Sequence, residues 1–337
     1  MRDSPGGLSV INGKIIRTCI ICGSDDYSPI FTYTYKFLKD VRGSSAASLE
    51  KRGWSEDVTS TIVKCSRCAC IYIRDVFVPS RRRGKGPSDH DEGANTGAET
   101  PLRIMAKEGY KYYKPFDNQN WVVRNLVLLA ADRQGRDIKF LDFGAGGGEA
   151  SNAARVCGVR DVVAYDPNYP VHIQEQFGRT NFPGIRCVRS KDELVELGPF
   201  DVVVFQSVVE HVLDPRSELK TIYHNMSKGG YLYINNPFMD LDHELEALLA
   251  ATKIEKKDSI SHYHPGHLNY MTPGQFSRLL KDAGFRITPM VHHPPLPLAR
   301  GHLGRYLIRN IKCGIRLAQN ILGVPYSRHF FVVRKPG

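Results

Sequence analysis

The sequence contains no apolar run as long as the roughly 18 residues of a membrane span, and its first 25 residues lack the apolar segment of a secretory signal. Both absences favour a cytoplasmic protein. Cysteines kept among cytosolic thiols seldom form disulfides, so the eight present here are expected to bind metal, to react or to pack as thiols. There is also no internal repeat.

The 337 residues are 42% hydrophobic, a composition typical of a globular chain of about two domains. Acidic residues are the scarcer charge, and the formal net charge is +11. This excess favours an anionic partner, such as a nucleic acid, a phosphorylated or nucleotide-linked substrate, or an anionic membrane surface. The charge alone does not choose among them.

Three regions follow one another along the chain. Residues 1–78 are rich in β-branched and aromatic residues and predict a small β-rich module. Residues 79–104 contain almost no apolar residue up to Pro101 and predict a linker. Residues 105–337 alternate strand and helix signals and form the second domain, with a helical insertion at 292–327. Seven strands are expected there, at residues 138–143, 162–165, 185–188, 201–206, 231–235, 285–291 and 330–334. A helix is expected at 273–283, with Thr272 as its N-cap, Pro273 in its first turn and Gly284 just past its end. Such alternation predicts an α/β fold whose largely parallel sheet is covered on both faces.

Two cysteine pairs lie in the β-rich module. Cys19 and Cys22, like Cys65 and Cys68, are separated by two residues, which is the ligand spacing of a tetrahedral structural zinc site. Four thiolates would leave no position open for water or substrate. The alternative is four unrelated thiols. Cys70 is expected to be a core thiol rather than a ligand.

A glycine loop follows the first strand of the second domain. In FLDFGAGGGEAS, Asp142 ends the strand and glycines occupy positions 144, 146 and 148. The dinucleotide pattern counted from Gly144 would require a sixth-position glycine, but Glu149 stands there, where a pyrophosphate would lie. Asp166 ends the next strand, where a carboxylate accepts the hydroxyls of a ribose. This combination favours a nucleoside without phosphates.

The D-x-G-x-G-x-G string followed by a strand-end acid resembles class I S-adenosylmethionine (SAM)-dependent methyltransferases. Residues 200–215, 229–238 and 267–285 resemble later landmarks of the same family, and the resemblance covers roughly 105–335. It implies a doubly wound, Rossmann-like sheet of seven strands, the last antiparallel. The CxxC…CxxC module further resembles a subset found in sugar, glycan and natural-product biosynthesis, although Ala69 replaces the usual glycine.

The resemblance also implies roles for individual residues. Asp142 would serve the methionine amino end of the cofactor, Asp166 the ribose, Ser190 the adenine and Gln206 the methionyl side. The complete cofactor-binding set is Asp142, Gly144, Ala145, Gly146, Asp166, Pro167, Ser190 and Gln206. The alternative for the two acids is a helix cap or a turn former, which is common for Asp at strand ends.

Three residues are candidates for the catalytic base. His211 is preferred, with a histidine that packs its helix as the alternative. Glu210 is its neighbour, and both are expected at the start of a helix, where only one of them would face the substrate. His267 lies in a histidine-rich insertion with His262 and His264. That insertion is interpreted as a lid over the substrate, a solvated loop or a metal site, although no carboxylate pattern accompanies the histidines.

The sequence therefore predicts a SAM-dependent methyltransferase with structural Zn²⁺, acting on a small-molecule acceptor such as a sugar, nucleotide-sugar or glycan. An RNA methyltransferase whose module and RRRGK linker bind phosphates is one alternative. A zinc-containing binding protein with an inactive core is another. The basic amphipathic segment 303–322 is expected to cover the pocket or to lie on an anionic membrane.

Overall fold

The computed structural model describes residues 8–11, 14–36, 57–77, 118–135, 137–169, 184–236, 267–288 and 330–337. The predicted linker 79–104, the insertion 292–327 and the basic segment 303–322 lie outside these residues. No helix in this part of the chain is long and apolar enough to cross a membrane.

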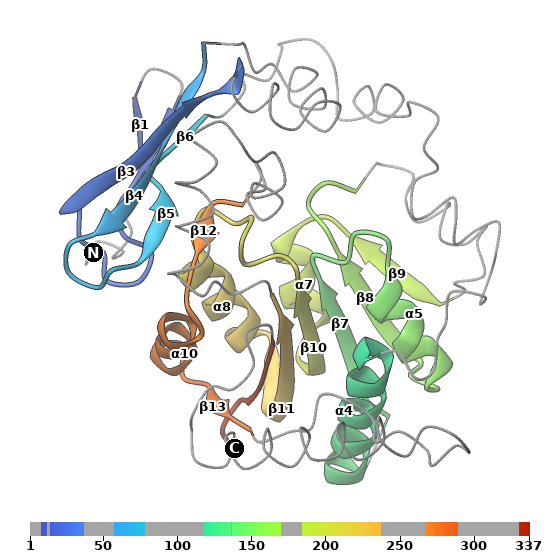
Figure 1. Cartoon of the computed structure of the whole chain (residues 1–337). Helices are drawn as coiled ribbons and strands as arrows, with labels where there is room; N and C mark the ends of the chain where they lie inside the picture. The colour runs from blue at the N-terminus through green and yellow to red at the C-terminus, as the bar shows by residue number, and fades with distance from the viewer. Residues whose placement is uncertain are drawn as a thin grey trace, which may run out of the picture. The chain divides into compact units, whose positions relative to one another are not determined.

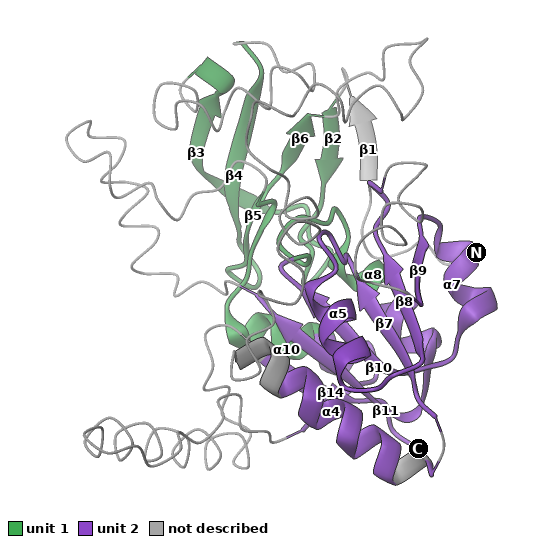
Figure 2. Ribbon diagram, turned by 90° about the vertical axis from the view of Figure 1, so that its right-hand side faces the viewer, with its two compact units in different colours: residues 1–85, 208–218, 237–279 green, residues 86–207, 219–236, 280–337 purple. Residues whose placement is uncertain are grey.

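Two compact units make up the chain, coloured separately in Figure 2. Unit 1 comprises residues 1–85, 208–218 and 237–279, and unit 2 comprises residues 86–207, 219–236 and 280–337. Of the described residues, 208–218 and 267–279 thus pack with the amino-terminal module, although the sequence pattern places them inside the second domain.

Unit 2 is built on a seven-stranded sheet, whose strands appear in Figure 1. The strands are β7 (Lys139–Phe143), β8 (Asp161–Tyr165), β9 (Ile185–Val188), β10 (Phe200–Gln206), β11 (Met226–Asn235), β13 (Arg286–Ile287) and β14 (Phe330–Arg334). Their order is β13-β14-β11-β10-β7-β8-β9. Strands β7 to β11 are parallel, and β14 is antiparallel to both β11 and β13. The predicted α/β sheet with an antiparallel last strand is confirmed.

The sequences of the central strands β7 and β10 are nearly continuous apolar runs, because both faces of the sheet are covered. The helices are α4 (Asn118–Gln134), α5 (Glu149–Val156), α7 (Lys191–Leu197), α8 (Pro215–His224) and α10 (Pro273–Asp282). Val122 and Leu126 of α4 belong to the same buried cluster as Phe140 and Val202 of the sheet. The predicted start of α10 is confirmed: Gln275 N donates to the Thr272 hydroxyl, and Thr272 N donates back to the Gln275 side chain.

Unit 1 contains two small antiparallel sheets. One has the strands β1 (Leu8–Ile11), β2 (Lys14–Arg17) and β6 (Asp75–Phe77), and the other has β3 (Tyr27–Thr34), β4 (Thr59–Cys65), β5 (Ile71–Ile73) and β12 (Asn269–Tyr270). Strand β12 pairs with the edge of β5, and Tyr270 joins Tyr33 and Ile62 in the core of this unit. The module predicted for residues 1–78 is therefore β-rich, and a late segment of the chain adds one of its strands.

Candidate functional site

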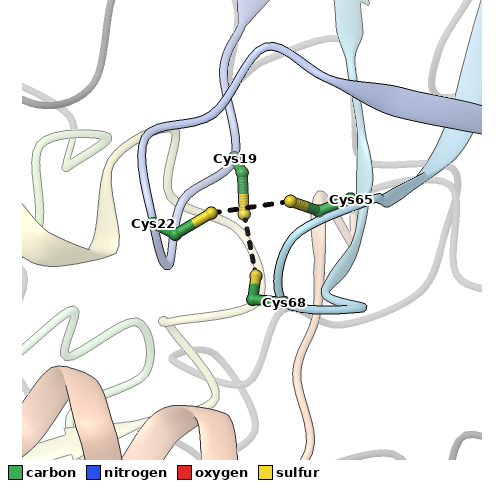
Figure 3. Close-up of side chains that lie close together, drawn as sticks. All are labelled: Cys19, Cys22, Cys65 and Cys68. Atoms are coloured by element: carbon green, nitrogen blue, oxygen red, sulfur yellow. Dashed lines mark hydrogen bonds between the residues drawn. The ribbon is translucent and has the colours of Figure 1, made fainter.

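Four cysteines of unit 1 converge at the ends of β2 and β4 (Figure 3). The sulfurs of Cys19 and Cys68 are 3.4 Å apart and those of Cys22 and Cys65 are 3.5 Å apart, and all four lie within 4.8 Å of one another. Zinc–sulfur bonds of ~2.3 Å in a tetrahedron would hold the sulfurs about 3.8 Å apart, so the residues present fit a zinc ion. All four are free thiols.

Each pair lies on a tight turn of the same design. Gly23 N donates to Cys19 O at 2.8 Å, and Ala69 N donates to Cys65 O at 2.9 Å. The closing residue of each turn is left-handed, with φ of 73° at Gly23 and 56° at Ala69. Glycine adopts this conformation without steric cost, whereas alanine does not. The departure from glycine at residue 69 thus leaves the turn intact but strained.

Cys70 is fully buried beside this cluster. The pKa of the Cys19 thiol is lowered to about 4, and the hydrogen bond between the Cys19 and Cys70 side chains is the largest cause. A deprotonated sulfur is the form that binds metal. Cys70 is buried as expected, and its thiol acts on the cluster through Cys19.

The glycine loop of unit 2 is fixed to the end of the neighbouring strand. Gly144 N and Ala145 N both donate to Tyr165 O, at 2.7 and 2.9 Å. Gly144, Gly146 and Gly148 have φ of 79°, 48° and 76°, which explains why the loop needs glycines. A Cβ added to Gly146 would meet no atom within 4 Å, so open space adjoins the loop there.

Asp166 lies beside this loop, as its position at the end of β8 predicts. Its Oδ2 accepts a hydrogen bond from Gly146 N at 3.1 Å, and its Oδ1 accepts one from Asn168 N at 2.8 Å. The residue is half-buried and Pro167 is exposed. The second bond also forms the turn that the alternative interpretation expected, so Asp166 shapes the loop while it remains accessible.

Asp142 is buried at the end of β7. Its Oδ2 accepts bonds from both the backbone N and the hydroxyl of Ser151, at 2.9 and 2.8 Å. Gly148 has no side chain to cap α5, so this carboxylate satisfies the amide of the first turn instead. Burial raises the pKa of Asp142 to about 6. The helix-cap role considered for this acid is present.

Ser190 and Gln206 lie at the same edge of the sheet, at the carboxyl ends of β9 and β10. The Ser190 hydroxyl caps α7 by accepting from Asp192 N at 3.1 Å, and Glu193 completes a capping box. Gln206 is half-buried and is followed by Ser207, whose φ of 50° is unusual for a residue with a side chain. The predicted cofactor residues therefore gather at one edge, where the order of strands reverses at β7.

The prediction that Glu210 and His211 begin a helix is wrong. They lie in a turn, in which His211 N donates to Val208 O at 2.9 Å. Helix α8 begins at Pro215 because Asp214 Oδ1 accepts bonds from the backbone N of Arg216 and Ser217, both at 3.1 Å.

In this turn the side chains of Glu210 and His211 approach each other. Glu210 Oε1 and His211 Nε2 are 3.9 Å apart, and the His211 ring lies edge-on to that of His267 at 4.8 Å. Glu210 is 2% exposed, whereas the His211 side chain is 40% exposed. Sequence analysis found no carboxylate with the histidines because Glu210 comes from a different segment. His262 and His264 lie outside the described residues.

Arg17 and Asn269 were missed by sequence analysis. Both are buried in unit 1, and the Arg17 guanidinium donates to the Asn269 side-chain oxygen. Neither residue belongs to a motif, and they are 252 positions apart in the chain.

A family model described as "Methyltransferase domain" matches residues 96–289. The chain is 24% identical over 210 residues to a ubiquinone biosynthesis O-methyltransferase of Acinetobacter baylyi, covering 58% of this chain and 83% of that protein. It is 28% identical over 211 residues to the protein of that name from Caulobacter sp. (strain K31), covering 59% and 80%. Among solved structures, the plantazolicin methyltransferase BpumL in complex with SAH matches 70% of this chain and 90% of its own, with a TM-score of 0.42 and 14% identity. The chain therefore belongs to the methyltransferase-domain family and is a SAM-dependent methyltransferase.

Proposed function

We propose that the protein transfers the methyl group of SAM to a hydroxyl oxygen of a small molecule, with sugars, nucleotide-sugars and glycans as the first acceptor classes. Oxygen is favoured because the two relatives are named O-methyltransferases. The observation that carries the proposal is the cluster of Glu210, His211 and His267, which contains a proton acceptor. Glu210 and His211 follow shortly after the end of β10, which is assigned to the cofactor.

The cofactor is assigned to the sheet edge of unit 2. The Asp166 carboxylate binds the two ribose hydroxyls, since it is half-buried and lies against the glycine loop. Asp142 faces the amino end, where a negative charge is favourable. Ala145, Pro167 and Ser190 line the nucleoside, and Gln206 lines the methionyl part. The bound cofactor supplies a methyl group on a sulfonium, so these residues have to orient it and exclude water.

His211 receives the proton of the acceptor. With the cofactor bound, the acceptor oxygen would replace sulfur on the methyl carbon, and the hydroxyl proton would pass to the His211 imidazole. The buried Glu210 carboxylate stabilises the resulting imidazolium, and such a base contributes about 10²- to 10⁴-fold to the rate. Gln206 and Glu210 are four residues apart, so their α-carbons are separated by at most about 14 Å.

The cysteine cluster is assigned to structural zinc. Cys19, Cys22, Cys65 and Cys68 supply four thiolates within 4.8 Å of one another, which leaves the metal no open position for substrate. Its role is to hold the two turns of unit 1 together.

Labelled methyl transfer tests the proposal. The full-length protein is incubated with methyl-labelled SAM and, separately, with a set of sugars and nucleotide-sugars, a set of phenols, and total RNA. We expect label in an O-methylated small molecule at a rate that changes little between 50 and 300 mM salt. Label confined to RNA, with turnover that collapses with salt, would instead identify an RNA methyltransferase. Calorimetric binding of S-adenosylhomocysteine without transfer to any acceptor would indicate an inactive binding protein.

A further inference from the structure

We propose that Arg17 and Asn269 are positioning residues for the methyl-transfer reaction, through which the amino-terminal module holds the turn that carries Glu210 and His211. This inference rests on the proposed function, because it assigns a purpose to that turn. Both residues belong to unit 1, together with the turn itself and His267.

Asn269 bonds to the backbone on both sides of the candidate base. Its side-chain amide nitrogen donates to Val209 O and to Val212 O, both at 2.7 Å. These two carbonyls bracket Glu210 and His211 in the chain. One of the two carbonyls between them is also engaged, since Glu210 O accepts from the backbone N of Leu268 at 2.6 Å and of Asn269 at 3.3 Å. The turn is thus held by donors from the segment that also carries His267.

Arg17 determines which way the Asn269 amide faces. The guanidinium donates to Ile73 O at 3.0 Å and to Leu268 O at 3.2 Å, and its other nitrogen donates to Asn269 Oδ1. An arginine has only donors, so the amide must turn its oxygen toward Arg17 and its NH₂ group toward the turn. The reversed amide would place its oxygen against two carbonyl oxygens and its NH₂ group against a cation.

Burial prevents water from competing for these hydrogen bonds. Arg17 is 2% exposed and Asn269 is 5% exposed, so water cannot replace a lost partner at low cost. The turn itself has little internal support, because it lies between the end of β10 and the cap of α8 and has no helical ladder. A displacement of about 1 Å at a catalytic group can lower a rate by roughly 10²-fold.

Two further bonds explain why the module suits this task. Arg216 Nη2, from the segment after the turn, donates to Ile21 O at 2.7 Å within the first cysteine turn. Gln275 Nε2, from the start of α10, donates to Cys68 O at 3.1 Å within the second. The two cysteine turns therefore bind Arg216, which follows the turn of Glu210 and His211 in the chain, and Gln275, which follows Asn269.

Asn269→Asp is the decisive variant. It keeps the size of the side chain and an oxygen for Arg17 but removes both donations to the turn. We expect kcat to fall at least 10-fold, while the Kd for S-adenosylhomocysteine stays within 2-fold of that of the unaltered protein. Asn225→Asp is the matched control, because the Asn225 amide donates to Thr221 O in unit 2, and kcat should hold there. Arg17→Lys keeps the charge but replaces two separate donor nitrogens by one, so it should not reach both the backbone carbonyls and Asn269 Oδ1. Combined with Asn269→Asp it should add less than its separate effect.

A readout that needs no acceptor separates this inference from the proposed function. Imidazole signals of His211 and His267 in histidine-labelled protein should shift in Asn269→Asp and in Arg17→Lys but not in Asn225→Asp. Unshifted imidazole signals in both variants would overturn the positioning role, whatever the activity. An unchanged kcat in Asn269→Asp would also overturn it. If the unaltered protein binds S-adenosylhomocysteine but methylates nothing, the proposed function fails while the imidazole signals still test the contact. If Asn269→Asp does not fold, Arg17→Lys carries the same two measurements.

Discussion

The Asp142 carboxylate accepts two hydrogen bonds from Ser151, one from the backbone and one from the hydroxyl, in a site closed to solvent. A buried carboxylate without a cation takes up a proton more readily than an exposed one, and its pKa is accordingly raised to about 6. In the proposed function the amino group of the bound cofactor would supply a positive charge here. That proposed contact of Asp142 would link cofactor binding to pH.

We expect the affinity for S-adenosylhomocysteine to fall as pH drops below about 6, because protonated Asp142 no longer attracts the amino group. In the free protein the effect has the opposite sign: the raised pKa means that the free energy of unfolding decreases as pH rises from about 4 to 6. Calorimetric titration from pH 5 to 8 measures the first effect. Asp142→Asn should flatten the profile, and an equally steep profile in that variant would exclude Asp142 as its source.

Asp166→Asn should weaken S-adenosylhomocysteine binding by about 10- to 100-fold, the range expected for loss of hydrogen bonds to a charged group. The control is Asp161→Asn at the start of the same strand, whose partner Lys139 lies 3.7 Å away in an exposed pair. Calorimetry on both variants checks the prediction. Equal losses in the two would indicate a general effect on β8 rather than contact with the ribose.

Ala69→Gly should increase the free energy of unfolding by about 1 kcal/mol. A residue with a Cβ is strained by ~1–2 kcal/mol in the left-handed conformation of residue 69, and glycine removes this strain. Part of the gain is offset, because glycine loses more backbone entropy on folding. Gly23→Ala makes the reverse change in the equivalent turn and should destabilise the protein by a similar amount. Urea denaturation of the zinc-saturated protein measures both. Destabilisation by Ala69→Gly would show that the strain is not released.

The purified chain should contain one zinc ion, and removing it should lower the melting temperature. Cys65→Ser should lose the metal, because a hydroxyl is a poor zinc ligand at neutral pH. Cys187→Ser, a half-buried thiol in β9, is the matched control and should retain it. Metal analysis by mass spectrometry together with thermal melting tests this. A full zinc content in Cys65→Ser would contradict the assignment of the site.

His211→Asn should lower kcat by 10²- to 10⁴-fold with little change in the Kd for S-adenosylhomocysteine. Glu210→Gln should have a smaller effect, since it acts through the imidazolium. His224→Asn, a histidine at the end of α8, serves as the control. Initial rates over a range of pH check these expectations, and an unchanged kcat in His211→Asn would remove it from the mechanism.

Local patterns predicted most of unit 2. The alternation of apolar strands with helices specified the sheet, and the end signals Thr272 and Pro273 specified the start of α10. The contact of Asp166 with the glycine loop followed from the rule that parallel strands share a carboxyl edge. Each of these inferences uses residues close in sequence or a strong topological rule.

The wrong prediction comes from a helix cap that lies later in the sequence than expected, and the omission comes from residues that are far apart in the chain. Glu210 and His211 read as helical, but the cap at Asp214 and Pro215 starts the helix later. The Arg17–Asn269 pair could not be found, because a buried arginine and asparagine carry no spacing signal across 252 positions. For Asp142 the sequence left two interpretations open, and its bonds to Ser151 establish the helix-capping one, while the cofactor role stays a prediction.

Strand β12 pairs with β5 through Asn269 and Tyr270, which the ribosome makes long after Ile71 and Tyr72. Until then the outer edge of β5 has unpaired backbone groups, and Arg17 lacks its asparagine acceptor. The amino-terminal module is thus synthesised before unit 2 but completed only after most of unit 2 has been made. Truncation before residue 269 should leave the amino-terminal module unfinished rather than yield a stable small domain.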